Sequence, residues 1–293
     1  MTEQDLAQAF EAERTHLRAV GYRMLGSLAE ADDVVQETWL RYRRADTSNV
    51  ENLRGWLTTV VARLCLDALR SRRARKEEPM GFTVPDVLIS GTGGPDPEQQ
   101  ALLADWVGIA MLVVLNKLTP PERLAFVLHD VFGMAFDEIA PIVDRSPEAA
   151  RQLASRARRR VRGSNLDSDV DVSGQRRIVD AFLAAGRDGD LTALISMLDP
   201  DAAVRADYGP KLAAASLEAH GAHNVAAQAL LFRRFAPGAR PAIINGTAGL
   251  VVFTGDRPYA VLGFTVRNER IVEIDILADP DRLARIDFSV LDA

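Results

Sequence analysis

Residues 136–162 read FDEIAPIVDRSPEAARQLASRARRRVR and contain the pattern from which the fold is inferred. A short apolar stretch, 136–143, is followed by a tight polar turn and then by Ser146–Pro147–Glu148, an order of residues that starts a helix. At 100° per residue, one side of this second helix is apolar. That side consists of Ala150, Leu153, Ala154, Ala157 and Val161. The spacing predicts two helices joined by a tight turn, a helix-turn-helix.

The opposite side of the second helix is polar and basic. It consists of Glu148, Gln152, Ser155 and Arg159, flanked by Arg151, Arg156 and Arg162. Arginine and glutamine can form paired hydrogen bonds with base edges, while serine and outlying arginines suit phosphates. This chemistry predicts a helix that lies in the major groove of DNA. The alternative interpretation is an arginine-rich helix that only faces solvent.

The net charge of the 293-residue chain is −6, which at first argues against a nucleic-acid partner. Residues 1–165 carry 22 Lys and Arg against 23 Asp and Glu, whereas residues 166–293 carry 13 against 18. Most of the excess acidity therefore belongs to the C-terminal part. The N-terminal part is nearly neutral and has two dense basic clusters, at 70–76 and 151–162, which favours nucleic acid as a partner.

The N-terminal 76 residues read as three helices, because apolar residues recur three and four positions apart. The first ends near Gly26, and Ser27 with Glu30 fits a capping box at the start of the second. The third runs from Leu53 into the basic cluster at 70–76, where five cations exceed what a helix dipole needs. Phosphate contact is the favoured explanation for this cluster, and a solvated surface is the alternative.

Segment 77–97 has four prolines and four glycines, so we predict a linker there. Helices then resume up to Arg162. After a polar stretch the pattern changes to two helices, 178–183 and 191–198, and four strands at 242–246, 249–254, 259–267 and 270–277. The turns Gly255–Asp256 and Asn268–Glu269 join consecutive strands into hairpins. The C-terminal part is therefore predicted to be α+β.

Composition excludes several classes of protein. The chain is 47% hydrophobic and 26% charged, as in globular proteins, so wholesale disorder is excluded. A single cysteine, Cys65, excludes an internal disulfide and a cysteine-based zinc cluster, and we expect no metal and no cofactor. Neither a secretory leader nor a run of about 18 apolar residues is present, so we expect a cytoplasmic protein without a membrane partner.

Three stretches together resemble the extracytoplasmic-function (ECF) sigma factors of bacterial RNA polymerase. They are DDVVQETWL at 32–40, WLTTVVARLCLDALR at 56–70 and AARQLASRA at 149–157. The resemblance implies two all-α domains, sigma-2 at 1–78 and a sigma-4 helix-turn-helix at 98–163, joined by a linker at 79–97. It implies a transcription factor that binds core RNA polymerase and promoter DNA, and we expect it to be monomeric when free. Because a single recognition helix binds DNA weakly, the polymerase would supply the remaining affinity.

The resemblance also assigns roles to the sequence patterns. The sigma-4 helix would read the minus-35 element through the seven polar residues from Glu148 to Arg162 given above. The minus-10 element would meet Arg63, Arg70, Arg72, Arg73, Arg75 and Lys76. The clamp helices of the polymerase would meet Asp32, Asp33, Gln36, Glu37, Trp39 and Leu40, an acidic and amide-bearing face that by default would be merely solvated.

The C-terminal part resembles the SnoaL-like cone that extends one subgroup of these sigma factors. The stretches that carry this resemblance are AFLAAGRDGDL at 181–191, Asn245–Gly246 and ADPDRL at 278–283. It implies a second linker at 164–173, an α+β regulatory domain at 174–293 and control of the sigma domains in cis. The implied interdomain residues are Phe82, Pro85, Asp207, Tyr208, Lys211, Asp279, Asp281 and Arg282. Three motifs of the subgroup are altered here, reading GFTVPD at 81–86, DYGPK at 207–211 and DPDRL at 279–283.

SnoaL-like cones also include enzymes in which a pocket carboxylate or histidine acts as a general base. The candidates are Asp207, His220, His223 and Asp275, although the two histidines lie in a polar stretch typical of exposed loops. We expect no enzyme, because fold alone does not make a domain catalytic. The alternative is a DNA-binding module fused to a SnoaL-like domain that binds a small molecule or acts as an isomerase or cyclase.

Overall fold

The computed structural model describes residues 3–46, 50–74, 83–90, 108–163 and 171–291. Contacts divide the chain into two compact units. Unit 1 consists of Met1–Glu78, Pro97–Asp105 and Val114–Ser164, and unit 2 of Pro79–Asp96, Trp106–Val113 and Asn165–Ala293. The five predicted segments are a finer division than these two units, and their boundaries stay a prediction.

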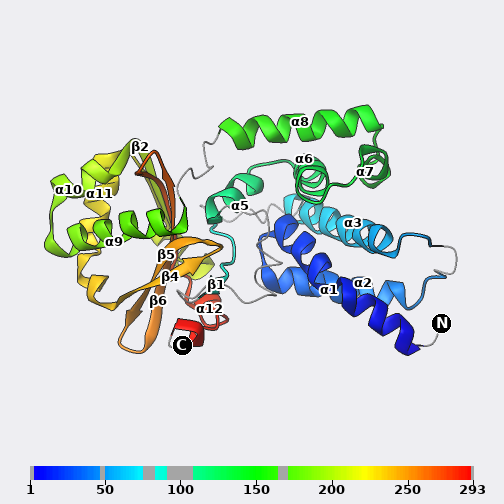
Figure 1. Cartoon of the computed structure of the whole chain (residues 1–293), viewed down its shortest axis with the longest axis horizontal. Coiled ribbons are helices and arrows are strands. Elements are labelled where there is room, and N and C mark those ends of the chain that lie inside the picture. The colour runs from blue at the N-terminus through cyan, green and yellow to red at the C-terminus, as the bar shows by residue number, and fades with distance from the viewer. Residues whose placement is uncertain (1–2, 47–49, 75–82, 91–107, 164–170, 292–293) are drawn as a thin grey trace. The chain divides into compact units, whose positions relative to one another are not determined.

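Unit 1 begins with three helices packed side by side (Figure 1). They are α1 (Glu3–Leu25), α2 (Leu28–Tyr42) and α3 (Leu53–Ala74). Gly26, with a φ of 73°, ends α1, and the Ser27 hydroxyl accepts the Glu30 amide at the start of α2. The predicted capping box is only half formed, because the Glu30 carboxylate binds Arg72 on α3 instead of reaching back to the cap. The box was thus partly wrong, and Glu30 ties α2 to α3.

The second helical group contains the predicted helix-turn-helix. Its elements are α5 (Gly108–Asn116), α6 (Pro120–Phe126), the π-helical turn η1 (Val127–Val131), α7 (Phe136–Val143) and α8 (Pro147–Gly163). Thr119 and Glu122 form a full capping box at the start of α6. Asp144 adopts a left-handed conformation, with a φ of 57°, in the turn between α7 and α8. Helix α5 is divided between the two units after Val113.

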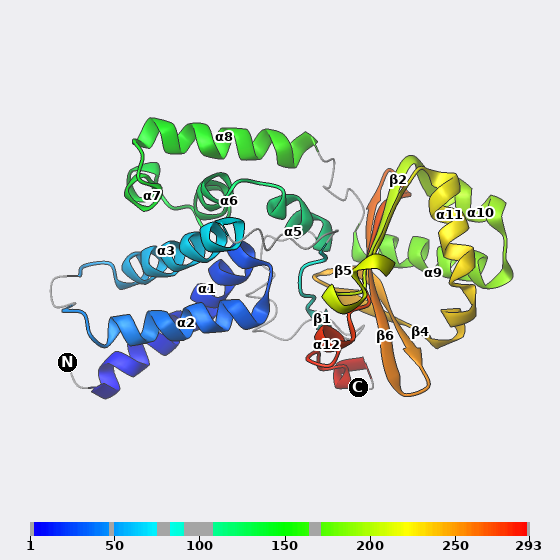
Figure 2. The same ribbon diagram turned by 180° about the vertical axis from the view of Figure 1, so that it is seen from behind.

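Unit 2 is built on one seven-stranded sheet. Figures 1 and 2 show the sheet with helices packed beside it. The strands are β1 (Ile89–Ser90), β2 (Leu198–Asp207), β3 (Leu217–His220), β4 (Ala239–Ile244), β5 (Thr247–Thr254), β6 (Arg257–Arg267) and β7 (Arg270–Leu277). Their order is β1-β4-β5-β6-β7-β2-β3, antiparallel except for the β2–β7 pair. The four predicted strands and both hairpin turns are confirmed, whereas β1, β2 and β3 were missed. Strand β1 comes from the segment predicted to be a linker.

Each face of the sheet buries its own apolar core, because successive residues of a strand point to opposite sides. On β5, Leu250 belongs to one core and Val251 to the other. The first core packs under α9 (Val172–Asp188), α10 (Leu191–Met197) and α11 (Ala222–Leu231), which cover that face in Figure 2. The second core contains Leu283 of α12 (Pro280–Leu283) and, from far upstream, residues of 84–89 and of α5.

No helix among the described residues is long and apolar enough to cross a membrane. Within the same residues, no group of three or more His, Cys, Asp or Glu side chains is arranged to hold a metal ion. Cys65 is buried in α3, and burial raises the pKa of its thiol to about 12.

Candidate nucleic-acid interface and strap

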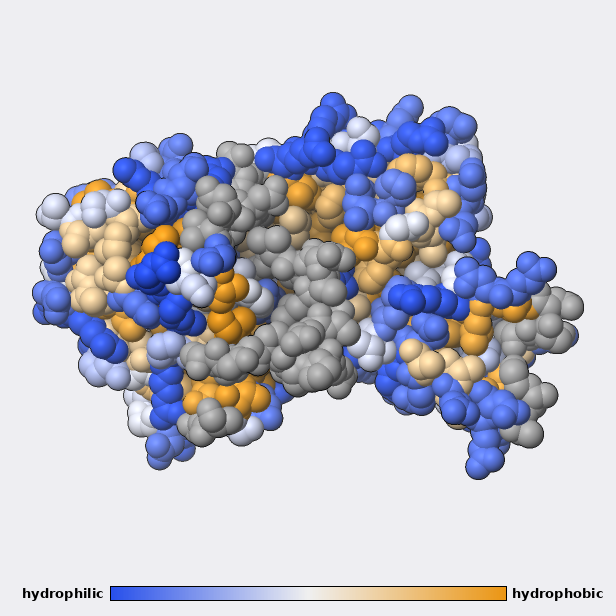
Figure 3. Space-filling view, in the orientation of Figure 1, coloured by the Kyte–Doolittle hydropathy of each residue, from blue (hydrophilic) through white to orange (hydrophobic). Residues whose placement is uncertain are grey.

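Helix α8 separates an apolar side from a basic side, as its sequence pattern predicts. Ala150, Ala154, Ala157 and Val161 are buried and Leu153 is half-buried. Glu148, Arg151, Gln152, Arg156, Arg159 and Arg162 are exposed, and Ser155 is half-buried. The space-filling view shows this hydrophilic surface running along α8 (Figure 3). The helix therefore presents donors suited to bases and phosphates on a surface that is open within unit 1.

A buried carboxylate on α6 holds two of the arginines of α8. Glu122 accepts from Arg156 at 3.1 Å and from Arg160 at 2.7 Å, and its side chain is only 5% exposed. Burial alone would raise the pKa of Glu122, but hydrogen bonds from Thr119 and Arg156 and the charge of Arg160 bring it below its ordinary value. Glu122 thus serves as both helix cap and anchor of α8. Sequence reasoning did not single out Glu122 for either role.

The two helical groups of unit 1 are joined by a buried arginine. Arg123 on α6 is 3% exposed and donates from Nε and Nη2 to the backbone carbonyl of Arg23, at 3.0 and 2.8 Å. That carbonyl lies in the last turn of α1, where helical carbonyls lack partners within the helix. Nη1 donates to the side-chain oxygen of Asn116 at 2.5 Å. Burial first, and the charge of Arg72 second, lower the pKa of Arg123 to about 9.

A histidine on α1 lies at the same junction. His16 is hydrogen-bonded to Thr58 of α3 at 3.0 Å and meets the ring of Phe132 edge-on, with centroids 5.1 Å apart. Burial, followed by the charges of Arg54 and Arg23, lowers the pKa of His16 to about 4. An uncharged imidazole is therefore part of the contact between the two helical groups.

The predicted polymerase-binding face on α2 is only partly open. Asp33 and Gln36 are exposed and Leu40 is 37% exposed. Asp32 is exposed but paired with Arg18 at 2.6 Å, and the half-buried Glu37 is paired with Arg41 at 2.9 Å. Trp39 is half-buried, with its ring 5.1 Å from Phe10 and 6.1 Å from Tyr42. Its indole therefore contributes to the aromatic core under α2 as well as to the surface.

The predicted minus-10 residues follow α3 towards its C-terminal end. Arg63, Arg70 and Arg73 are exposed. Arg72 is half-buried and held by Glu30, so its guanidinium already has an acidic partner. Arg75 and Lys76 lie outside the described residues. The predicted minus-10 residues therefore include three exposed arginines within the described part of α3.

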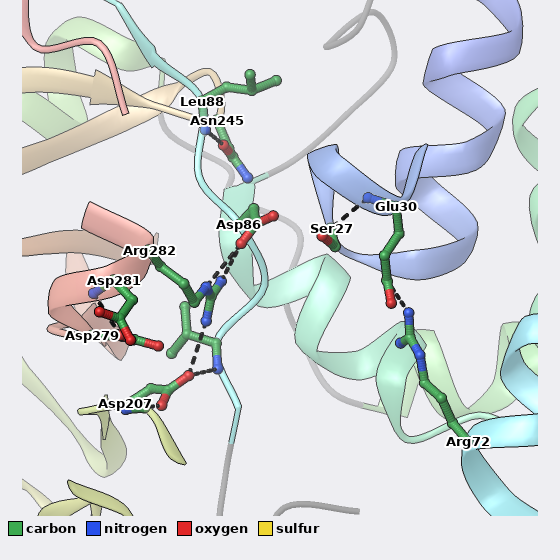
Figure 4. A network of polar contacts seen from close by, with 12 residues as sticks. Ser27, Glu30, Arg72, Asp86, Leu88, Asp207, Asn245, Asp279, Asp281 and Arg282 are labelled. Atoms are coloured by element: carbon green, nitrogen blue, oxygen red, sulfur yellow. Dashed lines mark hydrogen bonds and ion pairs between the residues drawn. The ribbon is translucent and has the colours of Figure 1, made fainter. Parts of the chain in front are cut away.

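In unit 2, residues 83–90 lie along the sheet and are called the strap. Val84, Val87 and Ile89 are buried in the second core, and β1 pairs with β4 at the edge of the sheet. The Val84 amide donates to Asp207 at 2.9 Å, and the Leu88 amide donates to the Asn245 side chain at 2.6 Å (Figure 4). The Asn245 amide donates back to the Leu88 carbonyl at 2.9 Å. The strap is thus held by apolar anchors and by backbone hydrogen bonds at Val84, at Leu88 and along β1.

An arginine closes over the strap from the C-terminal end of the sheet. Arg282 donates from Nε and Nη2 to Asp86 at 2.8 and 2.7 Å and from Nη1 to Asp207 at 3.1 Å (Figure 4). Pro85 is buried in the strap, and Phe82 lies outside the described residues. Asp207 and Arg282, two of the predicted interdomain residues, therefore do meet the upstream segment. Sequence reasoning did not single out Asp86, the partner of Arg282, or Asn245, the partner of Leu88, as site residues.

The other predicted interdomain residues lie beside this group. Asp279 caps α12 by accepting the Asp281 amide at 2.9 Å, and a Cβ on Gly209, whose φ is +78°, would come within 2.4 Å of its carboxylate. Lys211 pairs with Asp281 at 2.7 Å on the surface. Tyr208 is half-buried and faces a cavity on the other side of the sheet. Only a subset of the eight predicted residues contacts the strap itself.

The four candidate general bases are not gathered at one site. Asp207 holds the strap, and Asp275 is paired with Arg205 at 3.2 Å. Burial alone would lower the pKa of Arg205, but the carboxylates of Asp275 and Glu273 raise it above its ordinary value. His220 and His223 are exposed. The apolar cavity of about 120 Å³ between the sheet and α9 and α11 has no Asp, Glu or His among its described lining residues.

Comparison with known proteins decides the family. Residues 9–75 match Sigma-70 region 2, and residues 109–161 match Sigma-70, region 4. The chain is 38% identical, over 93% of its length and 91% of the relative, to the ECF RNA polymerase sigma factor SigJ of Mycobacterium tuberculosis. This chain belongs to the ECF RNA polymerase sigma factors. As a member of that family, it directs transcription initiation.

One further relative and one solved structure support the assignment of this sigma factor. It is 31% identical to a probable ECF sigma factor, SigI, of M. tuberculosis, over 95% of this chain and 94% of that one. The crystal structure of M. tuberculosis SigJ superposes with a TM-score of 0.75 at 33% identity and covers 95% of this chain and 98% of that chain. The two helical sigma domains and the C-terminal α+β domain are therefore confirmed as the fold.

Proposed function

We propose that α8 reads the minus-35 element of the promoter, within a complex that also contains core RNA polymerase. The observation that carries this proposal is the exposed surface of α8, where Gln152 and Arg159 are accessible while the alanine stripe is buried. The exposed arginines of α3 contact the minus-10 element, and Asp33, Gln36 and Leu40 on α2 contact the polymerase. Arg72 and Arg156 have acidic partners in the free protein and exchange them for DNA when it binds.

Both elements are contacted only if the two helical groups of unit 1 separate. The minus-35 and minus-10 positions are about 25 base pairs apart, or about 85 Å along B-form DNA. In unit 1, α6 packs against both α3 and α8. Because packed helices lie about 8–10 Å apart, α3 and α8 are roughly 20 Å apart in this closed form. Promoter binding therefore breaks the contact made by Arg123 and His16.

We further propose that the strap regulates this opening in cis. Residues 76–108 connect the two matched sigma regions and reach about 110 Å when extended. The strap and Ile109 of α5 pack in the same core of unit 2. While they are docked, only residues 76–82 remain as spacer, which reach about 24 Å. Docking therefore favours the closed form, and release of the strap favours promoter binding.

The C-terminal domain acts in this proposal by binding rather than by catalysis. Asp207 and Asp275 are both engaged by arginines, and neither exposed histidine is among the described lining residues of the apolar cavity. A general base needs a substrate within hydrogen-bonding reach, and these four groups do not share a pocket that would hold one.

Run-off transcription with core polymerase tests the promoter-reading role. The template carries a promoter selected with this chain, together with a series of single-base changes in the minus-35 element. Gln152→Ala should relax base preference at one minus-35 position by about 1–3 kcal/mol, and Arg159→Ala should weaken binding to all templates. Equal losses on every template for both variants, or no product from any selected promoter, would contradict it.

The same assay tests regulation by the strap in the full chain. Asp207→Asn removes charge from the acceptor of Val84 and Arg282 while keeping its shape, and it should raise promoter output. Lys211→Ala changes a charge at the surface nearby without touching the strap, and it provides the matched control. Unchanged or lower output from Asp207→Asn, relative to Lys211→Ala, would reject control by the strap.

A further inference from the structure

The C-terminal domain contains an apolar cavity that its own side chains leave unfilled. It lies between the sheet and the helices α9 and α11, and its volume is about 120 Å³. Many of the residues around it are small. They include Gly186, Ala206, Ala229, Ala236, Ala260 and Ala278. Protein interiors are normally packed to the density of organic crystals, so larger side chains at these positions would have closed the space.

The chemistry of the lining selects a type of ligand. Phe182, Leu250, Phe264 and Ile274 provide apolar walls, and an apolar cavity of about 150 Å³ is known to stay dry and to hold a benzene ring. Polar atoms come from Gln228 and from the hydroxyls of Tyr208 and Tyr259, which are hydrogen-bonded to each other. The described lining has no carboxylate, and its one cationic side chain, Arg233, belongs to an exposed residue. These groups suit an uncharged molecule with one hydroxyl or carbonyl.

The same strand ends, those of β2 and β7, form part of the cavity wall and part of the surface that the strap contacts. Along the end of β2, Ala206 and Tyr208 line the cavity, while Asp207 between them accepts the Val84 amide of the strap. At the end of β7, Leu277 lies in the core with the strap and Ala278 lines the cavity. The Ala278 amide donates to the Asp207 carbonyl at 2.7 Å, which fixes the two ends together.

We propose that this cavity binds a small uncharged molecule, about the size of one substituted aromatic ring with a single hydroxyl or carbonyl, and that its binding stabilises the docked strap. The ring lies among the phenylalanine and aliphatic side chains, and its polar group meets the Tyr208–Tyr259 pair. The effect on the strap deepens the proposed function and rests on it. By linkage, the docked strap and the ligand strengthen each other by the same factor.

Binding is tested on the full chain with phenol, toluene and benzoate as probes, followed by calorimetry or ligand-observed NMR. Phenol should bind saturably, toluene more weakly because it lacks the hydroxyl, and benzoate most weakly because its charge would be desolvated. Tyr259→Phe should lower the affinity for phenol and leave the affinity for toluene unchanged. Absence of saturable binding by any probe overturns the site, and a preference for benzoate overturns the uncharged class.

A matched pair of variants on α11 locates the site. Ala229 lines the cavity and Ala227, two residues away, does not. Ala229→Leu fills the space and should lower phenol affinity at least tenfold, whereas Ala227→Leu adds the same side chain outside the lining and should leave it unchanged. Equal affinities in the two variants would place the phenol elsewhere and overturn the assignment.

Hydrogen exchange of the Val84 and Leu88 amides tests the coupling. Saturating phenol should slow both amides by a common factor, and Asp86→Asn, which weakens the strap away from the cavity, should lower phenol affinity. Unchanged exchange, or unchanged affinity in Asp86→Asn, overturns the coupling. These measurements need neither DNA nor polymerase, so their failure is distinguishable from failure of the promoter assay.

Discussion

Unit 1 and unit 2 each use one arginine to hold together segments that are far apart in the sequence, but the two arginines differ. Arg123 is buried and donates to neutral oxygens of Arg23 and Asn116. Arg282 is half-buried and donates to the carboxylates of Asp86 and Asp207. Burial of a cation is costly unless its charge is compensated, and the depressed pKa of Arg123, about 9, reflects that cost.

The two junctions also differ in the contacts that support each arginine. The contact in unit 1 combines the directional bonds that the desolvated Arg123 makes with the packing of His16 against Phe132. The strap adds buried Val84, Val87 and Ile89 and a strand pairing to its ion pairs. Its stability is therefore distributed over many groups. In the proposed function, promoter binding opens the first junction, and the proposed ligand acts on the second.

The largest effect is expected at Arg123. Arg123→Ala leaves the Arg23 carbonyl without its donor and creates a cavity, so the free energy of unfolding of unit 1 should fall by about 2–4 kcal/mol. Arg282→Ala should cost about 1–2 kcal/mol, because the strap keeps its other anchors. Denaturant unfolding followed by circular dichroism measures both. Arg123→Lys, which keeps the charge and loses the forked geometry, should resemble Arg123→Ala, and a value close to wild type would show that charge alone holds the junction.

The second effect is a pH dependence of the free energy of unfolding, and His16 causes it. Its pKa is about 4 in the folded chain against about 6.5 when unfolded, so the unfolded state binds its proton first as pH falls. The stabilisation is fully present above pH 6.5 and is lost as pH falls towards 4. Since the imidazole is partly exposed, we expect about 1–2 kcal/mol after solvent screening.

His16→Gln keeps a polar group at this position and removes the titration. The free energy of unfolding, measured at pH 7, 6, 5 and 4, should therefore fall less steeply with decreasing pH for His16→Gln than for the wild-type chain. Parallel curves over this range would show that the imidazole does not contribute through its charge.

Much of the fold follows from local sequence, and the parts that do not are explained by long-range contacts. The helix-turn-helix was predictable because the alanine stripe and the Ser146–Pro147–Glu148 start are local features. The four strands 239–277 were predictable because tight turns join them in sequence. Strand β2 was missed because it pairs in parallel with β7, some 70 residues away, and β1 because two residues in a proline- and glycine-rich segment have no periodicity.

The residues of the candidate site also fall into two groups: those predictable from local sequence and those that depend on long-range contacts. The exposed residues of α8 could be assigned from helical spacing alone. Asp86 and Asn245 could not, because each acts on a partner about 160 to 200 residues distant. One signal was present for Asn245: it precedes a glycine in a hairpin turn, where its φ of 49° is tolerated, but that signal explains the turn and not the bond to Leu88.

A substitution with a smaller expected effect distinguishes the hydrogen bond between Asn245 and Leu88 from the conformation of the turn. Asn245→Gly keeps the positive φ and removes the side-chain acceptor of the Leu88 amide, so exchange of that amide should accelerate about tenfold, or about 1.4 kcal/mol. Asn268→Gly is the matched control, because Asn268 has the same φ of 49° and is exposed in another hairpin. Equal acceleration in both variants would assign the effect to the backbone instead of the side chain.

The smallest effect is expected at Lys211, and it limits what resemblance to the sigma subgroup implies here. The Lys211–Asp281 pair spans 2.7 Å, but both side chains are exposed, at 77% and 56%. Exposed ion pairs gain little, because water screens the attraction and ordering the long side chain costs entropy. Lys211→Ala should therefore leave exchange of the Val84 amide unchanged, whereas Arg282→Ala should accelerate it. Faster exchange in Lys211→Ala would show that the surface pair positions Arg282, and the boundary of the strap dock would then include the loop at 207–211.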